Sequence, residues 1–114
     1  MRLFFFLTSF LLLINSCQRK VKEFRNEKGF IEVFQGDEFK ILFNEDHSKG
    51  QSWSLVSEFD HSKLEYIKSN YHGPSRGLTD FIFEAKTKGD MELKFNLIEF
   101  SEVIKSVSLK IKIK

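Results

Sequence analysis

Alternation of apolar and polar residues along short runs is the feature that most limits the folds open to this chain. In residues 81–85, and again in residues 91–97, the odd-numbered residues are all apolar. A period of two places each apolar set on one side of a β-strand and leaves the other side in solvent. Gly89 permits the positive φ of a tight turn between the two runs. Residues 77–97 are therefore predicted to form a β-hairpin.

Further short runs of strand type surround this stretch, and no helical pattern lies between them. They cover residues 30–34, 38–43, 52–56, 64–67 and 106–114. Strands without intervening helices favour antiparallel pairing in two packed sheets. A chain of 114 residues, 41% hydrophobic and with 14 Phe, suits one domain with a core that needs no disulfides. We predict a single immunoglobulin-like antiparallel β-sandwich of about seven strands.

The charge balance argues against a nucleic-acid partner. Eighteen basic and 16 acidic residues give a net charge of +2, and the two signs are mixed along the strands. Nucleic-acid binding normally needs a concentrated basic face. The three histidines lie more than ten residues apart and the chain has one cysteine, so we expect no metal site. A Gly-rich phosphate loop is missing as well, and we expect neither a cofactor nor a small-molecule substrate.

Two short stretches contain the residue types of an acid, a base and a nucleophile. They are Asp46-His47 with Ser48, and Asp60-His61-Ser62. Neighbouring residues on an extended chain point in different directions, and a catalytic triad is defined by three-dimensional geometry. We therefore expect no enzyme activity from either stretch.

The N-terminus has the pattern of an export signal. Arg2 precedes an apolar run over residues 3–14, which is shorter than the roughly 20 residues that span a bilayer. Ile14, Ser16 and Cys17 then resemble a bacterial lipobox, in which the cysteine is lipidated and becomes the new N-terminus. An unpaired cysteine in an exported chain otherwise lacks an explanation. The resemblance implies a protein anchored by lipid to the bacterial cell envelope, on its periplasmic or surface face.

These readings divide the chain into three parts. Residues 1–16 are expected to be the signal peptide, and residues 17–28 the lipidated Cys17 with a polar tether. The sandwich domain is expected to cover residues 29–114 and to be a monomer.

Three polar connections are candidates for partner binding. They cover residues 44–51, 69–76 and 98–105. In a Greek-key sandwich, alternate connections gather at one end, and loops on a rigid scaffold commonly bind partners.

The first two connections resemble those of chagasin-type inhibitors of papain-like cysteine proteases. That family has Asn-Pro-Thr-Thr-Gly, two residues and then Trp, where this chain has Asp46, His47, Ser48, Lys49, Gly50 and then Trp53. The family continues with a Gly-rich loop and a Thr, Phe, Phe, Ala, Gly, Leu, aromatic series. This chain has Gly73, Pro74, Ser75, Arg76, Gly77, Thr79, Phe81, Phe83, Ala85, Gly89, Leu93 and Phe95 there.

The resemblance implies an inhibitor whose three loops fill the substrate cleft of a papain-like protease. The first two loops would be residues 46–50 and 73–77. The family's third loop aligns at Glu99 and Phe100, where this chain is shorter and lacks the Arg-Pro of the family. Trp53, Phe81 and Phe83 would form the rigid scaffold beneath the loops.

The loop residues differ from those of the family, and two other functions stay open. One is a lipoprotein without inhibitory activity whose sandwich serves adhesion or assembly. The other is inhibition of a different hydrolase, such as lysozyme, through the same loops.

Overall fold

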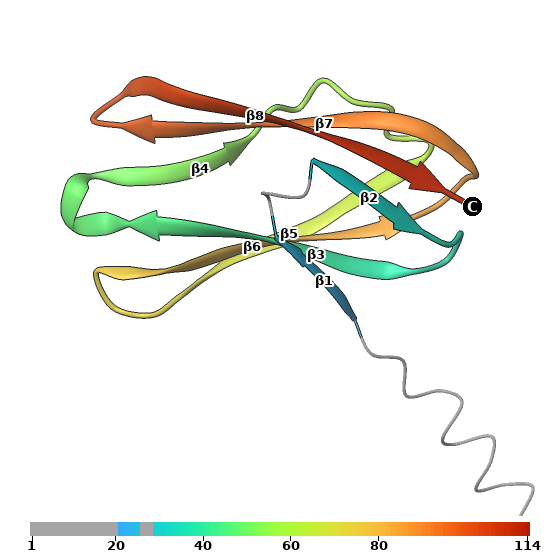
Figure 1. Ribbon diagram of the computed structural model, residues 1–114, viewed down its shortest axis with the longest axis horizontal. Coiled ribbons are helices and arrows are strands. Elements are labelled where there is room, and N and C mark those ends of the chain that lie inside the picture. The colour runs from blue at the N-terminus through green and yellow to red at the C-terminus, as the bar shows by residue number, and fades with distance from the viewer. Residues whose placement is uncertain (1–20, 26–28) are drawn as a thin grey trace, which may run out of the picture.

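The computed structural model describes residues 21–25 and 29–114 (Figure 1). These residues form the strands β1 (Lys22–Arg25), β2 (Phe30–Val33), β3 (Glu38–Asp46), β4 (Gln51–Leu55), β5 (Leu64–His72), β6 (Arg76–Ala85), β7 (Gly89–Glu99) and β8 (Glu102–Ile113). A short 3-10 helix, η2 (His47–Lys49), joins β3 to β4. Within the described ranges, no helix is long and apolar enough to cross a membrane. The expected signal peptide and Cys17 lie outside these ranges.

The strands form two four-stranded sheets, in the orders β1-β3-β6-β5 and β2-β8-β7-β4. Figure 1 shows the two sheets as stacked layers. The predicted all-β sandwich is confirmed. The pairs at one side of the sandwich, β1 with β3 and β2 with β8, are parallel rather than antiparallel. They arise because the N-terminal segment joins the edge of one sheet and then the edge of the other.

The predicted hairpin over residues 77–97 is wrong. β6 pairs with β3 and β5, whereas β7 pairs with β4 and β8 in the other sheet. Both strands face the same core from opposite sides, so their apolar residues alternate in the same way. Phe81 and Phe95 meet across that core, with ring centroids 5.0 Å apart. The period identified the buried face of each strand, and it carried no information about the pairing partner.

The expected tether is partly wrong as well, because β1 lies inside it. Residues 22–25 pair with residues 39–42 of β3. The Phe24 ring packs edge-on against Phe39, with centroids 6.1 Å apart. One apolar ring and a ladder of backbone hydrogen bonds are enough to place this charged segment on the sheet edge. The sandwich therefore begins before residue 29.

The strands also extend further into the predicted connections than the sequence indicated. β3 and β6 remain paired as far as Asp46 and Arg76, and β7 and β8 as far as Glu99 and Glu102. Their polar ends had been assigned to loops because the apolar alternation stops there. The three connections shrink to residues 47–50, 73–75 and 100–101.

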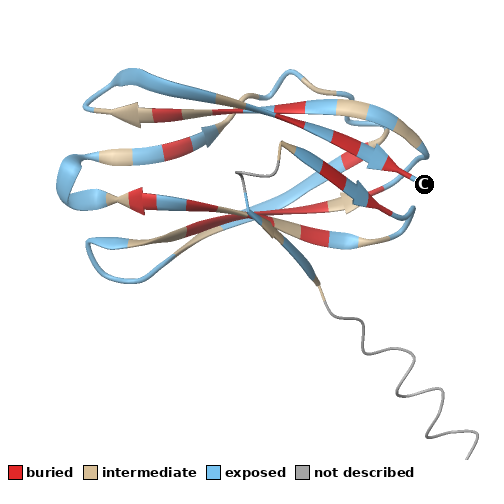
Figure 2. Cartoon of the chain, in the orientation of Figure 1, coloured by how far each residue is buried: buried red, intermediate tan, exposed pale blue. Residues whose placement is uncertain are grey.

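The core lies between the two sheets and is built from the alternating inward positions (Figure 2). Phe43 is at its centre and packs against rings of both sheets. Its ring centroid lies 4.5 Å from Trp53, 4.6 Å from Phe95 and 5.6 Å from Phe81. Aromatic pairs at such distances add to the stabilisation from burial alone. This cluster holds the two layers together directly beneath the connections at residues 47–50 and 73–75.

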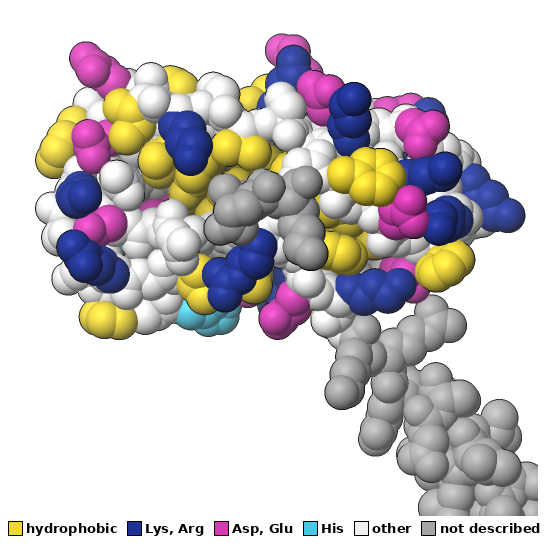
Figure 3. All heavy atoms as spheres, viewed as in Figure 1, with side chains coloured by type: hydrophobic (Ala, Val, Ile, Leu, Met, Phe, Trp, Pro, Cys, Tyr) yellow, Lys and Arg dark blue, Asp and Glu magenta, His cyan; other side chains and the backbone are white. Residues whose placement is uncertain are grey.

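The outer surface mixes both signs of charge. In the face that Figure 3 shows, basic and acidic side chains alternate with small apolar patches. Lys86, for example, bridges Glu65 and Glu84 across two strands of one sheet. Exposed pairs of this kind contribute little to stability, because water screens the two charges. The packed core therefore accounts for most of the fold's stability.

Replacing Phe43 by alanine should lower the free energy of unfolding by about 3–5 kcal/mol, since it removes a fully buried ring from the contact between the sheets. Urea denaturation measures this change. Phe30→Ala, at an exposed position of β2, is the matched control and should cost less than about 1 kcal/mol. Equal losses in the two variants would contradict the placement of Phe43.

Candidate functional site

Three connections lie at the same end of the sandwich (Figure 1). We call residues 46–50 the first loop, residues 73–77 the second loop and residues 99–104 the third loop. The His47 N–H donates to the Ser75 carbonyl at 2.6 Å, which joins the first loop to the second. The Phe100 N–H of the third loop lies 3.5 Å from the Gly50 carbonyl of the first loop. Of the loops predicted as a binding surface, the first thus contacts both of the others.

The first loop is held by hydrogen bonds within itself. The Asp46 Oδ1 atom accepts from the Ser48 backbone N–H at 3.0 Å and from the Ser48 hydroxyl at 2.5 Å. Asp46 is thereby the N-cap of η2, and Gly50 ends the turn with a φ of 70°. A polar loop whose groups already have partners needs little further ordering when a partner binds.

The Asp46 carboxyl has a pKa below its ordinary value. The main cause is the hydrogen bond from the Ser48 hydroxyl, which outweighs the opposing effect of desolvation. The Ser48 backbone N–H and the Arg76 guanidinium lower the pKa further, and the Arg76 Nε atom lies 3.2 Å from Asp46 Oδ2. The ionised Asp46 therefore links the first loop to the second.

The acid, base and nucleophile types in this loop do not form a triad. The Ser48 hydroxyl donates straight to Asp46, and His47 points away to Glu45, with Nε2 2.6 Å from Glu45 Oε2. The second stretch repeats this: the Ser62 hydroxyl donates to Asp60 at 2.5 Å. In neither stretch does the histidine lie between the serine and the acid.

The same tetrapeptide, Asp-His-Ser-Lys, occurs at residues 46–49 and at residues 60–63. In both copies the serine backbone N–H donates to the aspartate carboxylate, and each histidine stacks on an aromatic ring. The second copy lies towards the opposite end, where the Lys63 carbonyl accepts from Lys86. The reading of the sequence did not identify this repeat. It supplies a control segment with the chemistry of the first loop in another place.

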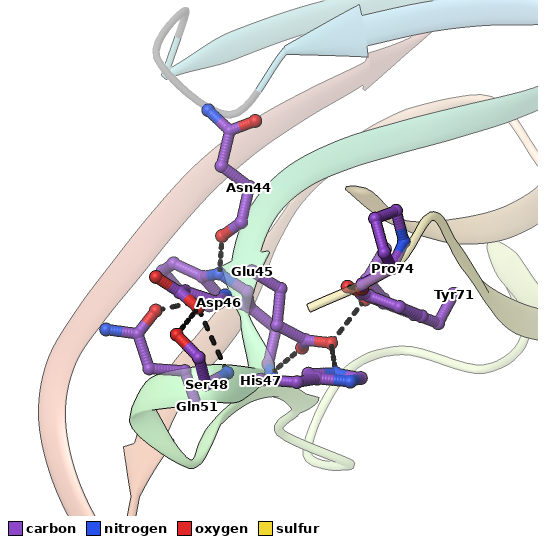
Figure 4. Close-up of polar contacts among 10 residues, drawn as sticks. Asn44, Glu45, Asp46, His47, Ser48, Gln51, Tyr71 and Pro74 are labelled. Atoms are coloured by element: carbon purple, nitrogen blue, oxygen red, sulfur yellow. Dashed lines mark hydrogen bonds and ion pairs between the residues drawn. The ribbon is translucent and has the colours of Figure 1, made fainter. Parts of the chain in front are cut away.

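A buried carboxylate under the first loop was also missed. Glu45 is 6% exposed and follows Phe39, Ile41 and Phe43 on the inward face of β3. Its carboxylate accepts from the Trp53 backbone N–H at 2.5 Å and from the Thr79 hydroxyl at 2.8 Å, and it pairs with His47. Figure 4 shows Glu45 with His47 beside it. The sequence did contain a signal for this burial, because Glu45 continues the inward-facing alternation of β3 although it is charged.

The second loop needs glycine where the backbones of β5 and β6 approach each other closely. A Cβ on Gly77 would lie 2.1 Å from the His72 carbonyl oxygen, and Gly73 has a φ of 115°. The Tyr71 hydroxyl donates to the Pro74 carbonyl and closes the loop. The Arg76 side chain is exposed apart from its contact with Asp46.

The third loop is built around a two-residue turn, Phe100 and Ser101, and has an exposed apolar tip. Phe100 and Ser101 both have positive φ, as a type I′ turn requires, although neither residue is favoured there. Phe100 is 77% exposed, and its ring covers Gly50, where a Cβ would lie 2.6 Å from Cε1 of that ring. Val103 and Ile104 add exposed fractions of 56% and 48%. These two residues lie within the predicted connection over residues 98–105, but they were not named individually as site residues. The Glu99 carboxylate accepts from Gln51 at 3.3 Å.

The residues predicted as scaffold lie below the loops. Trp53, Phe81 and Phe83 are buried, and the Trp53 indole N–H donates to the Asn44 carbonyl at 2.8 Å. Trp53 thus joins the strands that flank the first loop. Among the residues that the structure describes, no three acidic, histidine or cysteine side chains are grouped to hold a metal ion.

No protein-family model and no curated protein sequence matches this chain. Among solved structures, the chain is similar to the crystal structure of the cysteine protease inhibitor EhICP2 from Entamoeba histolytica. The TM-score is 0.69 at 12% identity, over 82% of this chain and 95% of that chain. The chain is also similar to the solution structure of amebosin, with a TM-score of 0.60 at 13% identity, over 84% of this chain and all (100%) of that chain. The chain has the fold of these two proteins. The resemblance to chagasin-type inhibitors is thereby supported at the level of the fold.

Replacing Ser48 by alanine should raise the pKa of Asp46 towards the ordinary value of about 4, because the main cause of its lowering is removed. At pH values above that ordinary pKa, Asp46 is ionised and its hydrogen bonds stabilise the loop in full. This contribution is lost as the pH falls through the lower pKa of the folded chain. An NMR titration of the carboxyl carbons measures both effects.

Ser62→Ala is the matched control for this titration. It should raise the pKa of Asp60, whose lowering is mainly due to the Ser62 hydroxyl, and leave that of Asp46 unchanged. A pKa of Asp46 that stays the same in Ser48→Ala would contradict the hydrogen bond described for the first loop.

Proposed function

We propose that this protein is an inhibitor of papain-like cysteine proteases that inserts its three loops into the substrate cleft. The observation that carries the proposal is that three short loops lie at one end of the sandwich, where the first loop contacts both the second and the third. The likeness to EhICP2, a cysteine protease inhibitor, supports it at the level of the fold. No acid, base and nucleophile come together in this end, and we propose no enzyme activity for it.

The first and second loops would contribute shape rather than new strong bonds. Asp46, Ser48 and His47 already have partners within the protein. A preformed loop loses little conformational freedom on binding, which favours affinity. Internal bonding of this kind also keeps the loop in one conformation when it enters a protease cleft.

The third loop would contribute most of the apolar contact. Phe100, Val103 and Ile104 are exposed, and Phe100 is held in a strained backbone conformation. Strain of this kind is concentrated at functional positions. Aromatic side chains, Phe among them, are enriched at the cores of protein interfaces. A partner with an apolar hollow beside its cleft fits this tip.

Export and lipid anchoring at Cys17 are part of the proposal, and their support is the sequence alone. β1 pairs Lys22 with Phe39, and Phe39 lies towards the end of the sandwich away from the loops. Residues 17–21 span at most about 18 Å when extended. An anchor at Cys17 would therefore hold that end near the membrane and direct the loops away from it.

An adhesion or assembly module is the second candidate. The observation in its favour is that Phe30 and Phe34 are exposed on and next to β2, far from the three loops. Exposed apolar side chains on a sheet edge can mark a protein contact. Inhibition of another hydrolase, such as lysozyme, through the same loops is a variant of the main proposal.

Residues 18–114 should inhibit papain competitively in the nanomolar to low-micromolar range. Inhibition is measured as the decrease in the rate at which papain hydrolyses a fluorogenic peptide. Replacing residues 46–50 by a glycine-serine segment should abolish inhibition, because the preformed loop is lost. The same replacement at residues 60–63 is the control and should leave inhibition unchanged. If wild type does not inhibit at high micromolar concentration, the protease proposal fails, and lysozyme and envelope partners are the next targets.

Replacing Phe100 by asparagine and Ser101 by glycine should stabilise the fold by about 1–2 kcal/mol, because both replacements suit positive φ. The same double variant should raise the inhibition constant about tenfold or more, since it removes the apolar tip. Thermal unfolding and the papain assay measure the two effects. Phe34→Asn, at the other end, should leave inhibition unchanged. Stabilisation without any loss of inhibition would exclude the tip from the binding surface.

A further inference from the structure

His47 lies between Glu45 of β3 and Tyr71 of β5, neither of which was named individually as a site residue. On one side its Nε2 atom is 2.6 Å from the buried Glu45 carboxylate of β3. On the other side its ring stacks on Tyr71 of β5, with centroids 3.8 Å apart and planes within 19°. The imidazole is therefore fixed in position and in plane, although it is half exposed to solvent.

Glu45 is itself immobilised by both sheets. Its Oε1 atom accepts from the Trp53 backbone N–H of β4, and its Oε2 atom accepts from the Thr79 hydroxyl of β6. A buried carboxylate needs such partners, because an unpaired charge in the interior is strongly unfavourable. Only the side facing the first loop remains, and His47 covers it. The position of His47 is thus set by strands rather than by the loop that carries it.

Tyr71 continues this series of contacts into the second loop. Its hydroxyl donates to the Pro74 carbonyl, while the His47 backbone N–H donates to the neighbouring Ser75 carbonyl at 2.6 Å. Desolvation, followed by the charges of Glu45 and Asp46, raises the pKa of Tyr71. The phenol therefore stays protonated and able to donate over a wider alkaline range than usual. Figure 4 shows how Glu45, His47, Tyr71 and Pro74 follow one another.

We propose that Glu45 and Tyr71 are positioning residues, which fix His47 between them and so hold the first and second loops in one arrangement before a partner binds. Neither residue touches the partner in this proposal. It rests on the proposed function of the loop end. The two loops act as one rigid element, so the ordering of residues 47–50 precedes binding and does not weaken it.

The test uses the full chain in detergent with two variants and two matched controls. Glu45→Gln removes the charge that faces His47, and Tyr71→Phe removes the hydroxyl while keeping the ring. Glu38→Gln lies on the same strand as Glu45, and Tyr66→Phe on the same strand as Tyr71, both at exposed positions. Urea unfolding first establishes conditions under which every variant is folded.

Amide hydrogen exchange by NMR reads the positions of the loops without a protease. In Glu45→Gln, the amides of His47, Ser48 and Gly50 should exchange about tenfold faster or more, which is the effect of losing a hydrogen bond to a charged group. In Tyr71→Phe, the acceleration should be smaller and should extend to the second loop. The controls should match wild type. Acceleration spread evenly over all strands, with none in excess at residues 47–50, would overturn the proposal.

Papain inhibition separates this proposal from the function on which it rests. If wild type inhibits, Glu45→Gln should raise the inhibition constant about tenfold while Glu38→Gln leaves it unchanged. An unchanged constant in a fully folded Glu45→Gln would overturn the positioning role in inhibition. If wild type does not inhibit, the proposed function fails, and the exchange data alone decide whether Glu45 and Tyr71 position the loops.

Discussion

The carboxylate of Glu45 takes a hydrogen bond from each of the two sheets, and the loop end is organised around it. Burying a charge there requires donors on β4 and β6 and a counter-group on the solvent side. Thr79 bonds this carboxylate from the sheet that contains Glu45, and the Trp53 N–H reaches it from the other sheet. Phe43, one inward position earlier on β3, packs against rings of both sheets at the same level. Polar and apolar contacts therefore specify the same alignment.

The alternation along the strands was enough to predict the sandwich and most of its core. It could not predict pairing, because β6 and β7 present the same pattern to one core from opposite sheets. It also ended the strands too early, since Glu45 and Asp46 are polar residues within or at the end of a strand. Residues 22–25 were assigned to the tether because they contain one apolar ring, Phe24, which is too little to form an alternating pattern. Their strand conformation depends on pairing with β3.

The loop end could be located from the sequence, but its internal organisation could not. The resemblance placed residues 46–50, 73–77 and 99–100 on one surface, and the structure brings these segments into contact. The contacts of Glu45 and Tyr71 depend on residues up to 34 positions away, as the Glu45 to Thr79 bond illustrates. No local pattern encodes such a distance. Val103 and Ile104 lay within the predicted connection over residues 98–105, and the sequence did not show that they belong to β8 with exposed side chains.

The pairing of β2 with β8 has a consequence for how the chain reaches this structure. Phe30 pairs with Lys110, a separation of 80 residues (110 − 30). Contacts between such distant segments require a long loop to close first, and folds that depend on them form slowly, in milliseconds to seconds. The second sheet cannot be completed until the last strand has been synthesised. A chain of this topology therefore stays open for longer than a helical protein of the same size, and its C-terminal strand is the element on which closure waits.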